Sequence, residues 1–192
     1  MTESPSAAAQ RLLVQAADVL LGAASSSSDA ELVALLGTCE SVVRRLDRVT
    51  VDAVAALDRR GVFAEHGYRS PVQALSDLLG WERFEARRRV VAAEQVTPRT
   101  GFDGAMLPAR LPGTAEVFAD GRTGLRHVEV IARVLAGKPA GRLSPEVWAG
   151  AEAQLAAKAD QYTPAELQHW GRALVELLDQ DGEQPDERPR PG

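Results

Sequence analysis

Apolar residues recur at steps of three and four along most of the chain, which is the spacing of one face of an α-helix. The longest such run follows Ser28 and Glu31, which have the spacing of a capping box, and it ends at Gly61. The pattern therefore predicts one long helix over residues 29–60. No segment alternates apolar and polar residues convincingly with a period of two, so the chain is predicted to be all-α.

The apolar stripe of this long helix leaves two interpretations open. A narrow stripe of two positions per heptad is typical of a coiled-coil dimer, whereas a wider stripe suits a helix inside a bundle. Here a second row widens the stripe on one flank, so we expect packing within the chain, with a homodimer through residues 29–60 as the alternative. The stripe consists of Leu32, Leu35, Cys39, Val42, Leu46, Val49, Ala53 and Ala56, flanked by Leu36, Val43 and Leu57.

Pairs of Ser or Thr with Pro mark the starts of three further helices, at Ser70, Ser144 and Thr163. The hydroxyl side chain caps the helix, and Pro fits its first turn. Glycines in tight turns, at Gly80 and Gly121, suggest two helix-turn-helix-like units. The signals together predict a multi-helix bundle of about eight helices, over residues 7–21, 29–60, 71–79, 82–96, 114–119, 125–135, 145–160 and 164–178.

Composition divides the chain into three parts. Residues 1–28 hold one helix and a serine-rich linker, and residues 29–179 form the main helical domain. Residues 180–192 are acidic, rich in proline and devoid of apolar side chains. Such a tail cannot bury enough apolar surface to fold, so it is expected to be a disordered linker.

Charge and cysteine content bear on the expected partners and cellular location of the protein. The net charge is −5, yet residues 40–142 carry more basic than acidic side chains, nearly all of them arginines. Arginine suits phosphate contacts, although net charge alone does not indicate nucleic acid. Cys39 is the single cysteine, so no internal disulfide is possible and a cytoplasmic location is expected. Neither a run long enough to span a membrane nor a secretory signal is found, so no membrane partner is expected.

Residues 67–93 carry the clearest functional signal. A short helix, a tight turn at Gly80 and a second helix with three consecutive arginines give the outline of a helix-turn-helix, in which the second helix enters the major groove of DNA. Arg83 and Arg87 fall one turn apart on one outward face, so DNA contact is predicted for them first. The predicted nucleic-acid-binding residues are Arg83, Arg87, Arg88, Arg89, Arg69 and Arg99.

A purely structural role competes with DNA binding in the same segment. Glu85 precedes Arg88 and Arg89 by three and four residues, the spacing of ordinary helix-stabilising ion pairs. Acidic side chains beside the arginines would also repel phosphates. Phe84 and Val91 make this helix apolar on a second side, as in the interior of a bundle. Both interpretations stay open at this stage.

Five motifs follow one another from Gly67: GYRSP, LLGW, EARRRVVAA, LPGTAEVFADG and HVEVIARVL. In this order they resemble the family called domain of unknown function 222, or the thirteen-E-twelve repeat proteins. The resemblance covers about residues 31–181, with the best matches at Gly67, Tyr68, Ala86, Arg87, Arg88, Leu111, Pro112, Gly121, His127 and Ile131. It implies an actinobacterial source and an association with DNA transactions, because these domains typically precede an HNH endonuclease domain. It supplies no known activity for the domain itself.

Nothing in the sequence assembles a catalytic centre. Family members continue past an acidic linker into an HNH module with a divalent metal, whereas this chain ends at Gly192 within such a linker, so a truncated member or a single domain is expected. The histidines His66, His127 and His169 are far apart and lack metal-ligand spacing. We therefore predict no catalytic residue, no metal site and no cofactor, and for His127 a capping or interhelical hydrogen bond.

Taken with the family resemblance, which implies a place N-terminal to an HNH endonuclease-like module, the sequence predicts a non-catalytic helical domain that assists DNA engagement. The expected partner is DNA, contacted by the arginines of residues 83–89. The alternative is a dimerisation or protein-interaction module built on the helix over residues 29–60.

Overall fold

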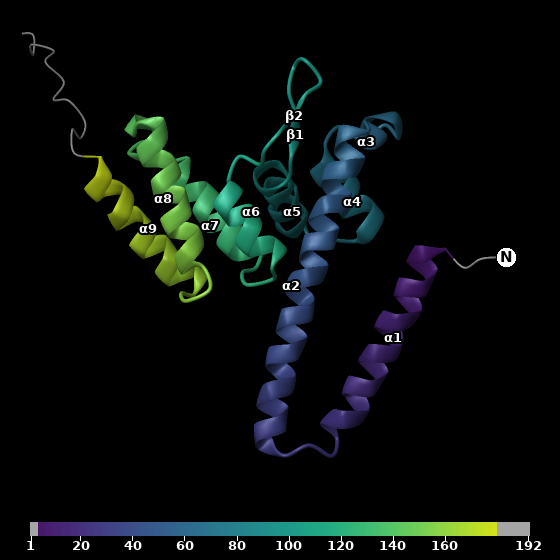
Figure 1. Cartoon of the computed structure of the whole chain (residues 1–192). Helices are drawn as coiled ribbons and strands as arrows, with labels where there is room; N and C mark the ends of the chain where they lie inside the picture. The colour runs from purple at the N-terminus through teal and green to yellow at the C-terminus, as the bar shows by residue number, and fades with distance from the viewer. Residues whose placement is uncertain (1–3, 180–192) are drawn as a thin grey trace, which may run out of the picture. The chain divides into compact units, whose positions relative to one another are not determined.

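A computed structural model describes residues 4–179, and these residues are almost entirely helical (Figure 1). The helices are α1 (Pro5–Ala24), α2 (Asp29–Arg59), α3 (Val62–Glu65), α4 (Pro71–Leu79), α5 (Arg83–Val96), α6 (Pro112–Ala119), α7 (Leu125–Leu135), α8 (Pro145–Lys158) and α9 (Pro164–Leu178). A 3-10 turn, Ala140–Arg142, follows α7, and two short strands, β1 (Arg99–Thr100) and β2 (Met106–Leu107), separate α5 from α6. The predicted all-α class is confirmed. The predicted linker over residues 180–192 lies outside the described residues.

The helix starts follow the predicted capping residues. Ser70, Ser144 and Thr163 each accept a hydrogen bond from the backbone N–H three residues further on, and Pro occupies the first turn of each helix. Before α2, the carboxylate of Glu31 accepts hydrogen bonds from the backbone N–H and the hydroxyl of Ser28, at 2.8 and 2.7 Å. Local sequence signals therefore set where these helices begin.

Two short elements are present that the sequence did not predict. Helix α3 lies within residues 61–69, where no helix is predicted, and the β1–β2 hairpin lies between the helices predicted over residues 82–96 and 114–119. The strands are antiparallel, and Gly104 adopts a φ of +79° near the tip of the hairpin. Strands of two residues are too short to show alternation, so periodicity cannot reveal them.

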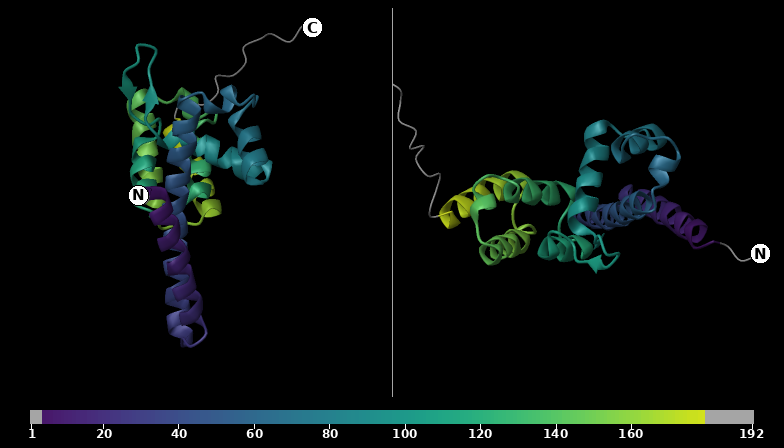
Figure 2. Two further views of the ribbon diagram at one scale, coloured as in Figure 1. Left: turned by 90° about the vertical axis from the view of Figure 1, so that its right-hand side faces the viewer. Right: turned by 90° about the horizontal axis from the view of Figure 1, so that it is seen from above.

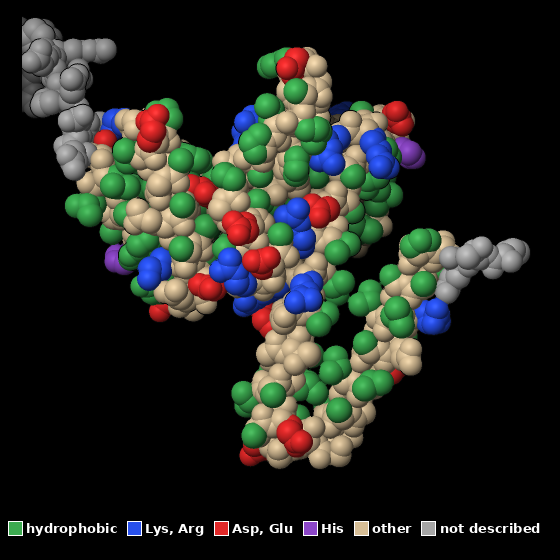
Figure 3. All heavy atoms as spheres, in the orientation of Figure 1, with side chains coloured by type: hydrophobic (Ala, Val, Ile, Leu, Met, Phe, Trp, Pro, Cys, Tyr) green, Lys and Arg blue, Asp and Glu red, His purple; other side chains and the backbone are tan. Residues whose placement is uncertain are grey.

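The chain divides into two compact units, Met1–Val43 and Arg44–Gly192, and the division falls inside α2. The first unit contains α1 and the first part of α2, and none of its described residues is buried. Hydrophobic side chains instead lie on the surface of both of its helices (Figure 3).

The second unit is organised around α7, which buries seven of its eleven residues. Its first turns join a hydrophobic cluster with residues of α2, α4, α5 and α6, among them Val51, Leu75 and Phe118. Its later turns join a second cluster with α8 and α9, around Ile131 and Leu155. Figure 2 shows α8 and α9 beside each other, in agreement with their contacts. The two predicted helix-turn-helix-like units differ, because α4 packs closely on α5 whereas α6 packs mainly on α8.

The long helix packs within the chain through its last part, as expected, but the predicted stripe is wrong. α2 buries Val51, Val54 and Ala55, none of which belongs to the predicted stripe. Stripe residues such as Leu46 and Val49 are exposed instead. The helix is apolar on more than one side, so periodicity could not decide which side the core of the second unit would cover.

Candidate nucleic-acid interface

Helices α4 and α5 form the predicted helix-turn-helix unit. α4 buries Ala74 and Leu75, and α5 buries Ala86 and Ala93, whose small side chains let the two helices approach closely. Gly80 ends α4 with a φ of +67°, a left-handed conformation that glycine adopts without steric cost. This tight turn brings the start of α5 next to α4.

The apolar spacing of α4 predicts an inner face of Ala74, Leu75, Leu78 and Leu79. Leu78 and Leu79 are instead exposed at the end of the helix. The buried part of α4 is its middle, and the last turn extends beyond the core. A short helix leaves few positions from which to infer its buried side, which is why the spacing misplaced these two leucines.

Arg83 and Arg87 are both exposed near the start of α5, on the single outward face that their spacing predicts. Neither side chain forms an ion pair or a hydrogen bond with any residue between 4 and 179. Each guanidinium group therefore keeps its five N–H donors for an external ligand. Contact of these two residues with nucleic acid stays a prediction.

Arg88 and Arg89 lie in a half-buried network of ion pairs, with side chains that are 13% and 17% exposed. Arg88 donates hydrogen bonds to Glu85, at 2.7 Å, and to Glu129 of α7, at 3.0 Å. Arg89 donates to Glu85 at 2.8 Å and to Asp47 of α2 at 3.4 Å. The two arginines thus connect α5 to α7 and α2, a structural role that competes with their predicted contact with DNA.

Aromatic rings and a shared carboxylate hold these two guanidinium groups in place. Arg89 lies over the ring of Trp81, at 4.3 Å from its centroid, and Arg88 lies 5.8 Å from the centroid of Phe84. The hydrogen bond from Arg89, together with the charge of Arg88, holds the pKa of Glu85 below its ordinary value despite partial burial. The network is therefore most stable when Glu85 is ionised.

The two remaining predicted residues, Arg69 and Arg99, come from segments outside α5. Arg69 is exposed in the loop before α4, next to Tyr68, which packs on the first hydrophobic cluster. Arg99 begins β1, and its Nε donates to the carbonyl oxygen of Pro108 at 3.3 Å. The structure thus distributes the six predicted arginines over a loop, a helix and a hairpin, with two of them engaged in internal ion pairs.

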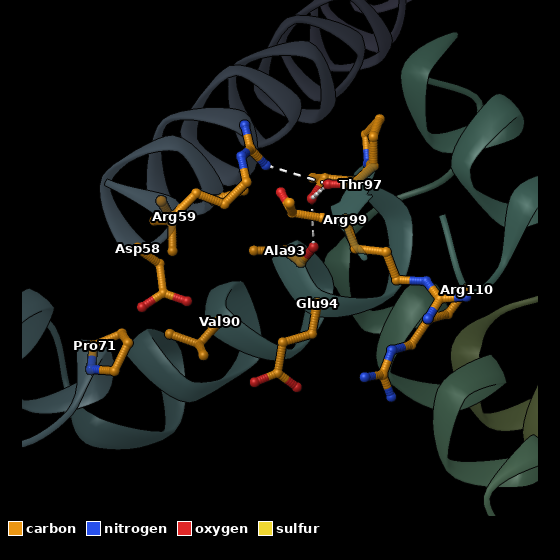
Figure 4. A pocket seen from close by; sticks show the side chains of 13 residues that line it. Asp58, Arg59, Pro71, Val90, Ala93, Glu94, Thr97, Arg99 and Arg110 are labelled. Atoms are coloured by element: carbon orange, nitrogen blue, oxygen red, sulfur yellow. Dashed lines mark hydrogen bonds between the residues drawn. The ribbon is translucent and has the colours of Figure 1, made fainter. Parts of the chain in front are cut away.

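A hollow of about 400 Å³ lies at the foot of the β1–β2 hairpin (Figure 4). Apolar residues of α2 and α5 line it, and charged side chains surround it: Asp58, Arg59, Glu94, Arg99 and Arg110. Sequence reasoning missed this site because its residues come from four separate segments. No spacing rule connects these segments, which are brought together by the folding of the second unit.

The β1–β2 hairpin also presents Phe102, which is fully exposed at its tip. Met106 in β2 is exposed as well. In Figure 1 the hairpin projects away from the neighbouring helices of the second unit. A large apolar side chain on a projecting loop is available to a partner rather than to the core.

His127 is buried in α7, and its Nε2 lies 2.9 Å from the carbonyl oxygen of Tyr162. The ring thus forms a hydrogen bond, as predicted, but its partner lies in the turn between α8 and α9 rather than in a second helix. Within residues 4–179, no group of three or more His, Cys, Asp or Glu side chains lies close enough together to hold a metal ion. No helix in the described part of the chain is both long and apolar enough to cross a membrane.

Glu152 is a buried carboxylate that the sequence does not reveal. Its side chain lies in α8 and is 2% exposed. It accepts hydrogen bonds from the backbone N–H groups of Gly113 and Thr114, at 3.1 and 2.6 Å, and from the Thr114 hydroxyl, at 2.6 Å. A carboxylate at a helix N-terminus satisfies free N–H groups and complements the helix dipole. Glu152 therefore fastens α6 to α8.

Comparison with known proteins agrees with the motifs. The chain matches the family model described as Domain of unknown function (DUF222) over residues 33–192. It is 32% identical over 157 residues to Uncharacterized protein MT1160 of Mycobacterium tuberculosis (strain CDC 1551 / Oshkosh), covering 82% of this chain and 37% of that protein. Uncharacterized protein Rv1128c of the H37Rv strain is also 32% identical over 157 residues, covering 82% of this chain and 34% of that protein.

The chain spans about a third of the length of the curated relatives that it matches. No solved structure matches it. The family match includes every helix of the second unit, together with the arginines and the hollow described above. On this evidence, the chain belongs to the DUF222 family of domains of unknown function.

Proposed function

We propose that this domain engages DNA through α5, with Arg83 and Arg87 as the residues in contact. The proposal rests on a difference in environment among the four arginines of α5. Arg88 and Arg89 are held by carboxylates within the protein, whereas Arg83 and Arg87 are exposed on one face and have no ionic partner among residues 4–179. Exposed guanidinium groups at the start of a second helix suit phosphates and base edges.

The β1–β2 hairpin supplies a second element of the proposed interface. It follows α5 directly, carries Arg99 at its start and presents the exposed ring of Phe102 at its tip. Apolar side chains on such projections insert between base steps in several classes of DNA-binding protein. We propose that the hairpin contacts the same DNA molecule as α5.

The domain itself is proposed to be non-catalytic and to serve a longer, HNH endonuclease-like protein. Support comes from the family resemblance and from the greater length of the curated relatives. In this proposal the helical domain supplies affinity for DNA, and the remainder of the longer protein supplies the chemistry.

Fluorescence anisotropy with a labelled duplex, measured over a series of salt concentrations, tests the DNA proposal. Each phosphate contact contributes about 0.9 to the slope of log affinity against log salt. The double variant Arg83→Ala with Arg87→Ala should therefore lower that slope by about 1.8. The matched control removes Arg126 and Arg172, two exposed arginines of α7 and α9, and should leave the slope unchanged. Absence of binding at low salt would refute the proposal.

Self-association through the first unit is a second candidate function, favoured by the apolar surface of α1 and the first part of α2. Leu12, Val19 and Leu21 are exposed on α1, and Val33 and Leu36 are 70% and 68% exposed on α2. Large contiguous apolar patches on soluble proteins mark sites of interaction, so exposed leucines and valines on both helices favour a partner that covers them. Two copies of this helical hairpin could bury these faces together as a four-helix bundle. Light scattering over a range of concentrations measures the mass that this proposal predicts.

A further inference from the structure

The hollow at the foot of the hairpin has a different chemical character at its two ends. Figure 4 places Asp58 and Pro71 at one end and Arg99 and Arg110 at the other, with Glu94 between them. A ligand that spans the hollow therefore meets Asp58 at one end, Glu94 in the middle, and the guanidinium groups of Arg99 and Arg110 at the other end. The Arg59 side chain, on the side of Asp58, donates a hydrogen bond to the carbonyl oxygen of Pro98.

The arginine end suits a phosphate group. Arg99 uses its Nε for the carbonyl oxygen of Pro108, which leaves its terminal nitrogens as donors. Arg110 forms no ion pair with any residue that the structure describes. Two guanidinium groups from different segments converge on this end, and arginine binds phosphate oxygens through paired N–H donors.

The floor of the hollow suits the face of a flat ring. Val54 and Ala55 of α2 and Val90 and Ala93 of α5 line it. Three of these side chains are buried by their neighbours, so the floor is firm and apolar. A volume of about 400 Å³ lies within the range of pockets that bind small molecules.

The carboxylates of Asp58 and Glu94 suit the hydrogen-bonding edge of a base. An ionised carboxylate only accepts hydrogen bonds, so Asp58 and Glu94 require N–H donors on the ligand. Guanine presents two adjacent donors, a ring N–H and an exocyclic amine, whereas adenine and cytosine present one amine each. A simple amphipathic anion would use the arginines and the floor but would meet two carboxylates without partners.

We propose that this hollow binds a single purine nucleotide, with guanine preferred over adenine. The phosphate lies at Arg99 and Arg110, the ring covers Val90 and Ala93, and the base edge donates to Asp58 and Glu94. The site is separate from Arg83 and Arg87, and the inference goes beyond the DNA contact proposed for α5. The same chemistry fits a free nucleotide and an unpaired nucleotide of a strand.

Titration calorimetry of the complete chain with dGMP tests the proposal. Saturable binding of dGMP is expected, with weaker binding of dAMP and binding of deoxyguanosine reduced about tenfold by the loss of the phosphate. Arg110→Gln should weaken the binding of dGMP only in part, because Arg99 still contacts the phosphate, and should leave the binding of deoxyguanosine unchanged. Asp58→Asn with Glu94→Gln should remove the preference for dGMP over dAMP. Equal thermal melting temperatures would show that these variants fold.

Matched controls separate the site from general charge effects. Arg126→Gln and Asp77→Asn change exposed charges outside the hollow and should leave the affinity for dGMP unchanged. No saturable binding of dGMP, or equally tight binding of hexanoate at the same site, would overturn the proposal. Binding of dGMP that survives Arg110→Gln without loss would also overturn it.

Two further arms separate the sources of the nucleotide and keep the two proposals apart. Tighter binding of a single strand that ends in dG than of dGMP would assign the site to unpaired nucleic acid, and equal binding would assign it to free nucleotide. The double variant Arg83→Ala with Arg87→Ala should weaken duplex binding and leave dGMP binding intact. Loss of one activity without the other therefore shows which proposal has failed.

Discussion

The two units of the chain differ in how far their amphipathic helices bury their apolar side chains. In the first unit, α1 and the first part of α2 are rich in leucine and valine, yet none of their described residues is buried. In the second unit, α7 has the same kind of sequence and buries most of its residues, because α5, α8 and α9 all pack on it. Among its described residues, the first unit has no third helix or strand to cover these two helices. An amphipathic pattern therefore predicts a helix, whereas burial depends on how many neighbours the fold supplies.

Truncating one large apolar side chain in each unit gives the largest expected contrast. Phe118 is fully buried in α6, so Phe118→Ala should lower the free energy of unfolding by about 3–5 kcal/mol. Leu12 is exposed in α1, so Leu12→Ala should change it by less than about 0.5 kcal/mol. Urea denaturation measures both values. A large cost for Leu12→Ala would show that α1 is covered in solution and would break the comparison.

The buried carboxylate of the second unit gives the next largest effect. Glu152→Gln keeps the size of the side chain but turns an amine toward backbone N–H groups that need an acceptor. The loss of charge-assisted hydrogen bonds should cost about 2–3 kcal/mol of unfolding free energy. The matched control is Glu116→Gln, at an exposed position of α6, which should have little effect. Equal costs for both variants would show that Glu152 does not fasten α6 to α8.

Placing charges on the first unit tests whether a second copy covers its apolar surface. Val33→Glu with Leu36→Glu introduces two carboxylates where a dimer would bury apolar side chains. The dissociation constant measured by sedimentation should rise at least about tenfold, which corresponds to about 1.4 kcal/mol. Leu78→Glu, at an exposed leucine of the second unit, is the control. A wild-type chain that stays monomeric at high concentration would exclude this candidate function.

Neighbouring arginines of α5 give a smaller and sharper contrast. Arg88→Ala removes hydrogen bonds to Glu85 and Glu129, and it should cost about 1 kcal/mol because water partly screens the pairs. Arg87→Ala removes an exposed side chain and should cost less than about 0.5 kcal/mol while weakening DNA binding. Thermal unfolding and anisotropy, measured on both variants, separate stability from binding. Weakened DNA binding in Arg88→Ala at unchanged stability would contradict the structural role of Arg88.

Local signals in the sequence predicted much of the fold. The features that depend on contacts between distant residues could not be predicted in this way. Ser70, Ser144 and Thr163 predicted where three helices begin, because an N-cap side chain binds a backbone N–H only three residues further on. Helix α3 and the strands β1 and β2 were missed because each spans only about one period, which is too short for a pattern to repeat. At the site, spacing placed Arg83 and Arg87 outward and Glu85 beside Arg88 correctly. It could not show the contact of Arg88 with Glu129, 41 residues away, or the hollow between α2 and α5.

The pH dependence of the free energy of unfolding should reveal the contribution of the ion pairs around Glu85. The hydrogen bond from Arg89 lowers the pKa of Glu85 in the folded state. A lowered folded pKa means that the stabilisation is present above the unfolded pKa, about 4.3, and is lost as pH falls through the folded value. Wild type should therefore be more stable than Glu85→Gln at pH 6, and the difference should shrink toward pH 3. Arg89→Gln should reduce the same pH dependence, because it removes the main donor to Glu85. A stability difference that stays constant from pH 6 to pH 3 would show that Glu85 does not gain its stabilisation from these arginines.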